Sequence, residues 1–189
     1  MSERSKISVH PKAQASDLSA TVSTVVHVSK AIGRALVVVV DDRAASGHPE
    51  DQLGALVKEL LNEGGFHVDA IVVVPSDMAD IRNALNTAVI GGVDLVVSVG
   101  GVGVSDRDVT PEATLELIDL QLPGIEQALR ASGLSAGSIE AGISRGAAGV
   151  SGSTLVVNLA GTRPAVRDGM ATLIPLAENV IHQLSVLDD

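Results

Sequence analysis

Many hydrophobic residues of this chain occur in short unbroken runs, separated by longer stretches in which apolar positions recur with helical spacing. Four segments contain the unbroken runs: RALVVVVDD, FHVDAIVVVP, VDLVVSVGG and TLVVNLAG. Runs of this kind predict strands that are buried on both faces, as in parallel sheets covered by helices.

The stretches between these runs predict helices. EDQLGALVKELLNEGG carries leucine or valine every three or four residues and ends at the pair Gly64–Gly65. SDMADIRNALNTAVIGG predicts a helix with Ser76 or Asp77 as its N-cap and Gly91 as its stop. Further helices are expected at 111–120, at 123–132 and through the C-terminal segment, with a break near Pro175. The Gly- and Ser-rich residues 134–153 match neither pattern.

The order of these elements predicts the fold class. Strand, helix, strand, helix and strand follow one another in the first half, which favours an α/β fold with a mostly parallel sheet and right-handed crossovers. Residues 1–30 are rich in serine with scattered charges, and we interpret them as an extension outside the core. Residues 31–189 then form one domain.

The composition narrows the possible classes of function. A formal net charge of -10 argues against nucleic-acid binding, which requires clustered lysine and arginine. The only aromatic residue is Phe66, so stacking platforms for bases are missing. There is no cysteine and therefore no thiolate metal site. No run reaches the roughly 20 apolar residues of a membrane span, and the first residues lack an apolar signal core, so a cytoplasmic protein without a membrane partner is expected.

Open parallel sheets bind ligands at the carboxyl ends of their strands, where the strand order changes direction. Four segments follow predicted strands and are expected to share this edge: Asp41–Gly47, Pro75–Asp77, Gly100–Thr110 and Ala160–Arg163. In the third of them, Gly100, Gly101 and Gly103 allow close approach of the backbone to a ligand, with amide groups available for an anion. Thr110 is expected to cap the next helix, with Pro111 at its first position.

The same loop carries charges that suit a phosphate and a metal. Asp106 and Asp108 offer the oxygen ligands that Mg²⁺ prefers, and Arg107 can pair with a phosphate or a carboxylate. The combination suits the phosphates of a nucleotide. An ordinary tight turn before a helix explains the loop equally well. The chain has neither a third glycine at the spacing of a dinucleotide fingerprint nor a P-loop.

A second motif suggests a different chemistry. GISRG, residues 142–146, matches the nucleophile elbow of serine hydrolases with Ser144 as nucleophile, and Asp168 and His182 follow in the expected order. The residues after it form a poor helix, and few residues remain for the acid and base. A glycine-rich loop whose Ser-Arg pair bonds a ligand or the backbone is the stronger interpretation.

Several segments, taken in order, resemble the MogA/MoaB family of molybdenum cofactor biosynthesis. They are VVDDRAASGHPEDQLG, GGVGVSDRDVTPEAT, PGIEQALRASG, ISRGAAG and TLVVNLAGTRPAV, and they cover the chain from about Arg34 onward. The resemblance implies a three-layer α/β/α domain with a mostly parallel central sheet. It also implies a homotrimer that binds molybdopterin and, in active members, transfers AMP from Mg-ATP to the terminal phosphate of the pterin.

The resemblance also implies a set of functional residues. Asp108 is the best-matched carboxylate and is implied as a Mg²⁺ ligand and catalytic group. Asp77 is implied in the same two roles, although a shift of one residue would place Ser76 there instead. Asp106 is a third metal candidate. The residues implied to bind substrate or nucleotide are Asp42, Gly100, Gly101, Gly103, Thr110, Ser144, Arg145, Asn158 and Gly161, and Asp51 matches another family position.

Several positions depart from the family pattern. Val102 replaces the threonine of Gly-Gly-Thr-Gly, and Val99 stands where the family often has threonine. Ala160 replaces proline, Thr162–Arg163 replaces Ser-Pro, and Asp106 adds a carboxylate. A lost hydroxyl could weaken phosphate binding by about 10- to 100-fold. The alternative to the adenylyltransferase is therefore a non-catalytic MoaB-type paralogue that binds molybdopterin without turning over ATP.

Overall fold

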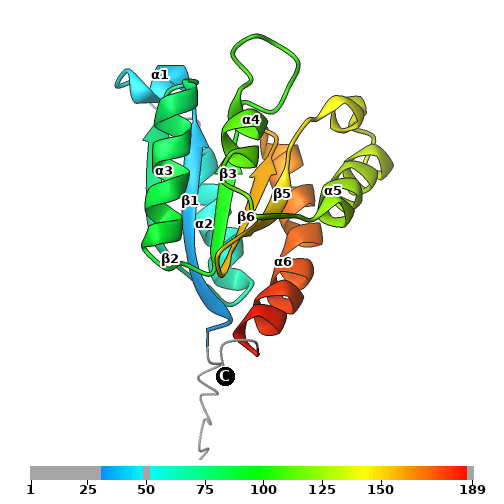
Figure 1. Ribbon diagram of the computed structural model, residues 1–189. Helices are drawn as coiled ribbons and strands as arrows, with labels where there is room; N and C mark the ends of the chain where they lie inside the picture. Colours follow the sequence, from blue (N-terminus) through cyan, green and yellow to red (C-terminus); the bar gives the residue numbers. More distant parts are fainter. Residues whose placement is uncertain (1–30, 49–51, 187–189) are drawn as a thin grey trace, which may run out of the picture.

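The computed structural model describes residues 31–48 and 52–186 (Figure 1). The expected N-terminal extension, residues 1–30, and Asp51 lie outside these ranges. One mixed sheet of six strands runs through the described residues in the order β2-β1-β3-β6-β5-β4. Because the chain passes from β1 to β2 on one side and later to β3 on the other, the strand order changes direction between β1 and β3.

Four strands are parallel and match the four unbroken hydrophobic runs. They are β1 (Gly33–Val40), β2 (Phe66–Val74), β3 (Leu95–Val99) and β6 (Thr154–Leu159). Two short strands complete the sheet in antiparallel orientation, β5 (Ala148–Ser151) beside β6 and β4 (Leu120–Gln121) at the edge. The mostly parallel sheet is confirmed.

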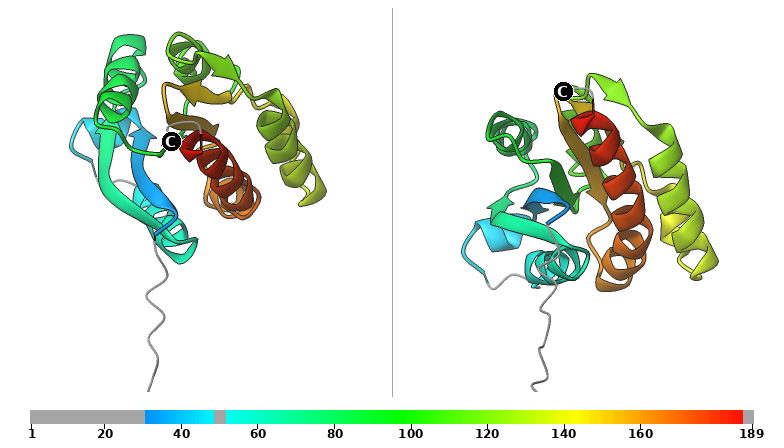
Figure 2. Two further views of the ribbon diagram at one scale, coloured as in Figure 1. Left: turned by 60° about the horizontal axis from the view of Figure 1, so that its bottom comes forward. Right: turned by 90° about the horizontal axis from the view of Figure 1, so that it is seen from below.

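The helices form a layer on each face of this sheet (Figures 1 and 2). One layer contains α2 (Leu53–Glu63), α5 (Pro123–Ser135) and α6 (Arg163–Ser185), and the other contains α3 (Met78–Ile90) and α4 (Thr110–Leu115). The four-residue helix α1 (Asp42–Ala45) follows β1, and the 3₁₀ helix η1 (Ile139–Ile143) follows α5. The three-layer α/β/α architecture is therefore confirmed.

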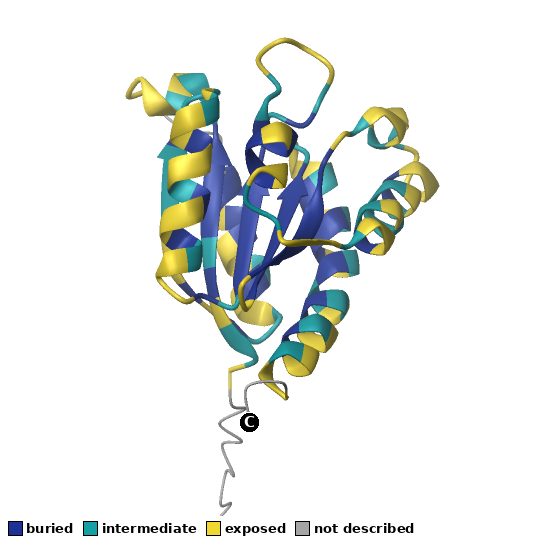
Figure 3. Ribbon diagram, in the orientation of Figure 1, coloured by how far each residue is buried: buried dark blue, intermediate teal, exposed yellow. Residues whose placement is uncertain are grey.

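The valine run of β1 explains why both layers form. Successive side chains of a strand point to opposite faces, so Val37 and Val39 pack with α2 and α6, whereas Val38 and Val40 pack with α3 and α4. All four are at most 7% exposed. Figure 3 shows this buried sheet between helices whose outer faces are exposed. None of the helices in the described ranges is long and apolar enough to cross a bilayer.

The structure corrects two sequence predictions and assigns one segment that the sequence left open. The helix expected at 111–120 ends at Leu115, because the chain then turns and Leu120–Gln121 pair with β5. The helix α6 does not break at Pro175, although a proline inside a helix removes one backbone hydrogen bond. Leu173 and Ala177, on either side of it, are fully buried, so packing against the sheet holds the helix together. The unassigned residues 134–153 form the end of α5, η1 and β5.

Candidate functional site

A cleft of about 540 Å³ lies where the carboxyl ends of β1, β3 and β6 meet. Its wall includes Val39–Asp41 from β1, Val99–Ser105 from β3 and Ala160–Thr162 from β6. Because β2, β1, β3 and β6 are parallel, the four segments predicted to share one edge do so. The cleft occupies the point where the strand order changes direction, which is where open α/β sheets bind ligands.

The glycines at the end of β3 allow three strand ends to converge. Gly100 has φ +103°, and a Cβ atom there would lie 2.5 Å from the carbonyl oxygen of Val40 on β1. Gly101 has φ +65°, and its Cβ would collide with the hydroxyl of Thr110. A Cβ on Gly161, after β6, would lie 3.2 Å from the Cα of Gly100. Only glycine suits the backbone conformation of Gly100 without strain. We call residues Gly100–Gly103 the glycine cradle.

Thr110 stabilises the cradle through two hydrogen bonds. It is fully buried, its hydroxyl donates to the carbonyl of Gly100 at 2.9 Å, and its amide donates to the carbonyl of Gly101 at 3.1 Å. The prediction that Thr110 caps the helix is wrong, because α4 begins at Thr110 and Val109 occupies the N-cap without a side-chain bond. The tertiary contact with Gly100 takes the hydroxyl that a cap would use.

Asp108 lines the cleft beside the cradle, where a Cβ atom on Gly103 would lie 2.8 Å from its Oδ2. One oxygen, Oδ2, accepts hydrogen bonds from the hydroxyl of Ser105 at 2.7 Å and from its amide at 2.9 Å. Partial burial raises the pKa of the carboxyl, but the bonds from Ser105, a bond from the Gly103 amide and the charge of Arg145 outweigh it and leave the pKa below its ordinary value. Asp108 is therefore held as a carboxylate at the wall of the cleft.

The other two predicted metal ligands do not join Asp108. Asp77 is the N-cap of α3 and accepts from the amides of Ala79 and Asp80, as one of the two sequence alternatives had it. Asp106 lies on the exposed part of the loop after the cradle. Across residues 31–48 and 52–186, no three His, Cys, Asp or Glu side chains are grouped closely enough to hold a metal.

Asp42 and Arg107 form an ion pair between the loops that follow β1 and β3. The two side chains are 2.7 Å apart, and the amide of Ser76 donates to Asp42 at the same distance. The bond from Arg107, and then that from Ser76, lower the pKa of Asp42. The pair therefore joins three of the four loops of this edge. The guanidinium of Arg107, which the sequence suggested as a partner for a phosphate, is thus already paired with a carboxylate.

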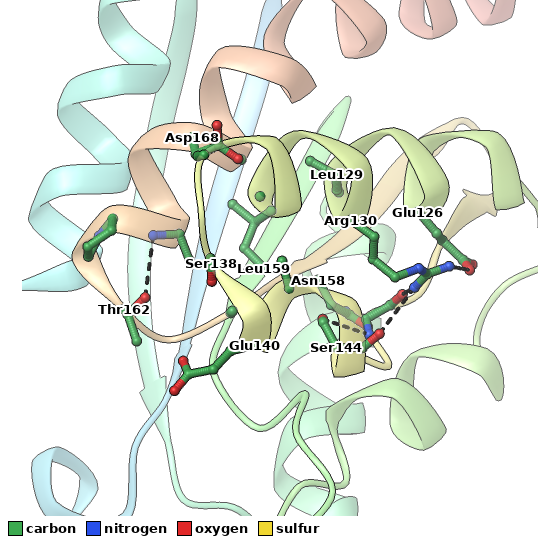
Figure 4. Close-up of a pocket in the computed structure, with 18 residues that line it drawn as sticks. Glu126, Leu129, Arg130, Ser138, Glu140, Ser144, Asn158, Leu159, Thr162 and Asp168 are labelled. Carbon is green, nitrogen blue, oxygen red and sulfur yellow. Dashed lines mark hydrogen bonds and ion pairs between the residues drawn. The ribbon is translucent and has the colours of Figure 1, made fainter.

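Ser144 and Arg145 have different positions. Ser144 lines the cleft and also a smaller cavity of about 110 Å³ between η1, α5 and α6, shown in Figure 4. Arg145 lines neither cavity; its guanidinium contacts the carbonyls of Gly103 and Asp108 and the carboxylate of Glu112.

Asn158 lines the smaller cavity and is only 3% exposed. Its Nδ2 donates to the hydroxyls of Ser98 and Thr114 at 2.8 and 2.9 Å, and its Oδ1 accepts from the amide of Ala147 at 3.0 Å. Both amide hydrogens are thus used within the protein. We call Ser98, Thr114 and Asn158 the buried polar cluster.

The structure rules out the serine hydrolase hypothesis. Ser144 follows a 3₁₀ helix and not a strand, so it is not on a nucleophile elbow. Asp168 and His182 lie on the same continuous helix, α6. Their separation of fourteen residues corresponds to about 21 Å along the helix axis, too far for the hydrogen bond that a triad requires.

Sequence reasoning missed several residues that shape this site. Ser105 bonds Asp108, and Glu112 bonds Arg145. The pair Glu126–Arg130 braces the segment after η1 and shows a sequence signal, because opposite charges four residues apart meet on one face of a helix. Ser105 bonds a residue of its own loop, only three positions away, and this short-range contact was overlooked. No local pattern indicates the role of Glu112, because its partner Arg145 lies on a distant segment of the chain.

Comparison with known proteins agrees with this architecture. The sequence profile of a family described as a probable molybdopterin binding domain matches residues 36–179. A molybdopterin biosynthesis protein from Mycobacterium abscessus is similar in structure, with 63% identity, a TM-score of 0.81, and coverage of 84% of this chain and 99% of that one.

Two relatives in sequence carry specific names. A molybdopterin adenylyltransferase of Helicobacter pylori is 32% identical over 139 residues, covering 71% of this chain and 77% of that protein. A molybdenum cofactor biosynthesis bifunctional protein of Chlorobaculum tepidum is 32% identical over 75% of this chain and 45% of its own length, so the chain spans about half of that relative. The matched profile and these relatives show that the chain belongs to the MogA/MoaB family of molybdenum cofactor biosynthesis proteins.

Proposed function

We propose that the protein is a molybdopterin adenylyltransferase, which transfers AMP from Mg-ATP to the terminal phosphate of molybdopterin and releases pyrophosphate. The observation that carries the proposal is the cleft at the β1/β3 switch point, where the glycine cradle and the carboxylate of Asp108 share one wall. The name of the Helicobacter pylori relative supports it.

The residues of the cleft suit this chemistry. A phosphate oxygen of the pterin would attack the α-phosphorus of ATP, and pyrophosphate would leave, so the protein must mainly position the groups and balance their charge. The cradle offers backbone amides to phosphate oxygens without side chains in the way. Asp42, Ser144 and Gly161 are the further residues proposed to contact substrate around this edge.

The donor set also fits Mg²⁺ that enters with ATP. Mg²⁺ keeps several waters and is commonly held by one or two carboxylates together with substrate phosphates. Asp108, which is held as an anion in the wall of the cleft, meets that requirement. When bound, the ion neutralises phosphate charge. Asp77 and Asp106 remain proposed ligands that would have to move toward Asp108, since the described structure does not group them with it.

The test is pyrophosphate release by the purified protein with ATP, Mg²⁺ and molybdopterin. Release is expected from the wild-type chain, and Asp77→Asn and Asp106→Asn measure whether those carboxylates contribute. Asp80→Asn is the matched control. Asp80 is exposed in the first turn of α3, so the substitution makes the same chemical change away from the cleft. No release from protein that has bound molybdopterin would reject the enzyme.

That outcome would support the second candidate, a MoaB-type paralogue that binds molybdopterin without turnover. The observation in its favour is Val102, which lies in the cradle at 5% exposure and offers no hydroxyl to a phosphate. Titration calorimetry separates the candidates: a binding protein takes up molybdopterin but releases no heat with Mg-ATP, whereas the enzyme binds both.

We also propose a homotrimer, as the family implies. Leu134, Ile139 and Ile143, at the end of α5 and in η1, are 51%, 85% and 57% exposed, which supports coverage of this surface by another chain. Sedimentation velocity tests the assembly, and a monomer at micromolar concentration would contradict it.

A further inference from the structure

Arg145 contacts both ends of the loop that follows the glycine cradle. Its backbone amide donates to the carbonyl of Val102 at 2.9 Å, and its Nε donates to the carbonyl of Gly103 at 2.6 Å. Its Nη2 bonds the carbonyl of Asp108. Residues 104–107 therefore form an excursion whose two ends are joined by one side chain.

The same guanidinium also joins this loop to the next helix, because Nη1 pairs with the carboxylate of Glu112 on α4. Three of the five N–H groups of the side chain are used in these contacts. Arg145 does not belong to the wall of the cleft among the described residues. The side chain therefore contacts the backbone next to the cradle and does not line the cleft.

The backbone that carries Arg145 is itself held from the opposite side. Arg130 on α5 donates to the carbonyls of Ser144 and Gly146, both at 3.3 Å. Glu126 pairs with Arg130 at 3.1 Å and accepts from the amide of Ala148 at 3.2 Å. Figure 4 shows Arg130 between Glu126 and Ser144. The segment 144–148 thus connects α5 to the loop that carries Asp108.

We propose that Arg145 is a positioning residue that sets the shape of the glycine cradle and the place of Asp108, and that Arg130 braces it from α5. The expected effect on nucleotide binding rests on the proposed function, whereas the positioning of the loop by Arg145 does not. It differs from the family-based expectation that Arg145 contacts the substrate directly. A planar guanidinium with several fixed donors suits three acceptors at once, whereas an ammonium is a single point charge.

Hydrogen exchange provides a test that does not depend on activity. In Arg145→Met, the amides of residues 101–109 are expected to exchange at least about tenfold faster, because the loop loses hydrogen bonds that a charged group donates. Amides of β3 and β6 are expected to be unchanged. Arg145→Lys keeps the charge but cannot reach all three acceptors, so it is expected to remain at least about threefold faster than wild type.

The matched control is Arg82→Met. Arg82 pairs with Glu116 on α4 at 2.8 Å, as Arg145 pairs with Glu112, but it bonds no carbonyl of the loop. Exchange at 101–109 is expected to stay within a factor of two in this variant. Glu112→Gln, a milder change, is expected to accelerate exchange about two- to threefold and covers the case that Arg145→Met does not fold.

Pyrophosphate with Mg²⁺ serves as the binding probe, and its affinity is expected to fall about tenfold in Arg145→Met and Arg145→Lys alike. In the release assay, the KM for ATP is expected to rise by a similar factor with an unchanged midpoint of thermal unfolding. Exchange at 101–109 within twofold of wild type in Arg145→Met, or full restoration of pyrophosphate binding by lysine, would overturn the inference. Wild-type protein that releases no pyrophosphate would reject the proposed enzyme and leave the exchange test intact.

Discussion

Two groups of polar residues, one within the sheet and one in the loop that follows β3, differ in how far their hydrogen bonds are used within the protein. In the buried polar cluster, Ser98 on β3 and Asn158 on β6 are paired in register, and Thr114 reaches them from α4. The other group follows Gly100 and contains Asp108 and Ser105, which line the cleft. In the buried cluster, both amide hydrogens of Asn158 and the hydroxyl of Thr114 donate to partners within the protein, whereas the open group presents a carboxylate and backbone groups to the cleft.

The two groups are connected through the backbone. Thr114 donates to the carbonyl of Thr110, and Thr110 donates to the carbonyl of Gly100. The closed cluster thus anchors α4 and the cradle, and the open group uses that anchor to offer a binding surface. We expect substitutions in the first group to cost stability and substitutions in the second to cost binding or turnover.

The largest effect is expected at Gly100, which lies between the two groups. Gly100→Ala places a Cβ atom 2.5 Å from the Val40 carbonyl in a backbone conformation that L side chains rarely adopt. We expect a loss of about 4 kcal/mol in the free energy of unfolding. Urea denaturation measures it, and Gly124→Ala, where a Cβ has open space within a helix, is the control. An equal effect of both variants would contradict this role of the cradle.

The next effect is expected in the buried cluster. Asn158→Leu keeps a similar volume but leaves the Ala147 amide without an acceptor and removes the donor that the Ser98 and Thr114 hydroxyls accept, so we expect a loss of about 3 kcal/mol in the free energy of unfolding. Ser98→Ala removes a single partner and is expected to cost about 1 kcal/mol. A stable Asn158→Leu protein that has lost only ligand binding would show that Asn158 belongs to the open group.

The third effect concerns turnover and not stability. Asp108→Asn is expected to lower pyrophosphate release by about 100-fold, or about 2.7 kcal/mol, because a neutral amide is a poor partner for Mg²⁺. The unfolding midpoint in urea is expected to stay close to that of wild type. If release persisted at the wild-type rate, the open group would not be the site of the reaction.

A smaller gain is expected at Val102. Val102→Thr supplies the hydroxyl that the family pattern has at this position, and we expect Mg-ATP to bind about tenfold more tightly, or about 1.4 kcal/mol. Calorimetry measures the affinity, with Val104→Thr on the exposed part of the loop as the control. Equal affinity in Val102→Thr and wild type would show that the missing hydroxyl does not limit nucleotide binding.

The smallest effect is expected at Asp42, through pH. Arg107 and the Ser76 amide lower the pKa of Asp42 in the folded protein below its ordinary value near 3.8. The pair therefore stabilises the fold above that pH, and the contribution is lost as pH falls through the lower, folded-state value. Asp42→Asn is expected to flatten the decline in stability between about pH 5 and pH 2. Urea titrations across this range compare the variant with wild type, and parallel curves would contradict the assignment.

Much of the fold, and the loop that carries the candidate site, could be predicted from local sequence patterns. The unbroken apolar runs predicted the parallel strands, because a strand buried on both faces needs no polar alternation. The glycines, together with Pro111, marked the loop after β3. The antiparallel strands β4 and β5 were not predicted, because two- and four-residue strands carry no measurable periodicity and their pairing depends on contacts with distant segments.

The sequence by itself determined the four parallel strands, the helices that cover them and the edge at which a ligand would bind, since these follow from hydrophobic periodicity and from the order of the elements. Only the tertiary structure decided the use of each polar side chain. Asn158 is enclosed, Arg107 is paired with Asp42 and Arg145 supports a loop, whereas Asp108 lines the cleft. The reason is that a polar group bonds the nearest partner that the fold brings to it, and most partners of Asn158, Arg107 and Arg145 lie dozens of residues away in the chain.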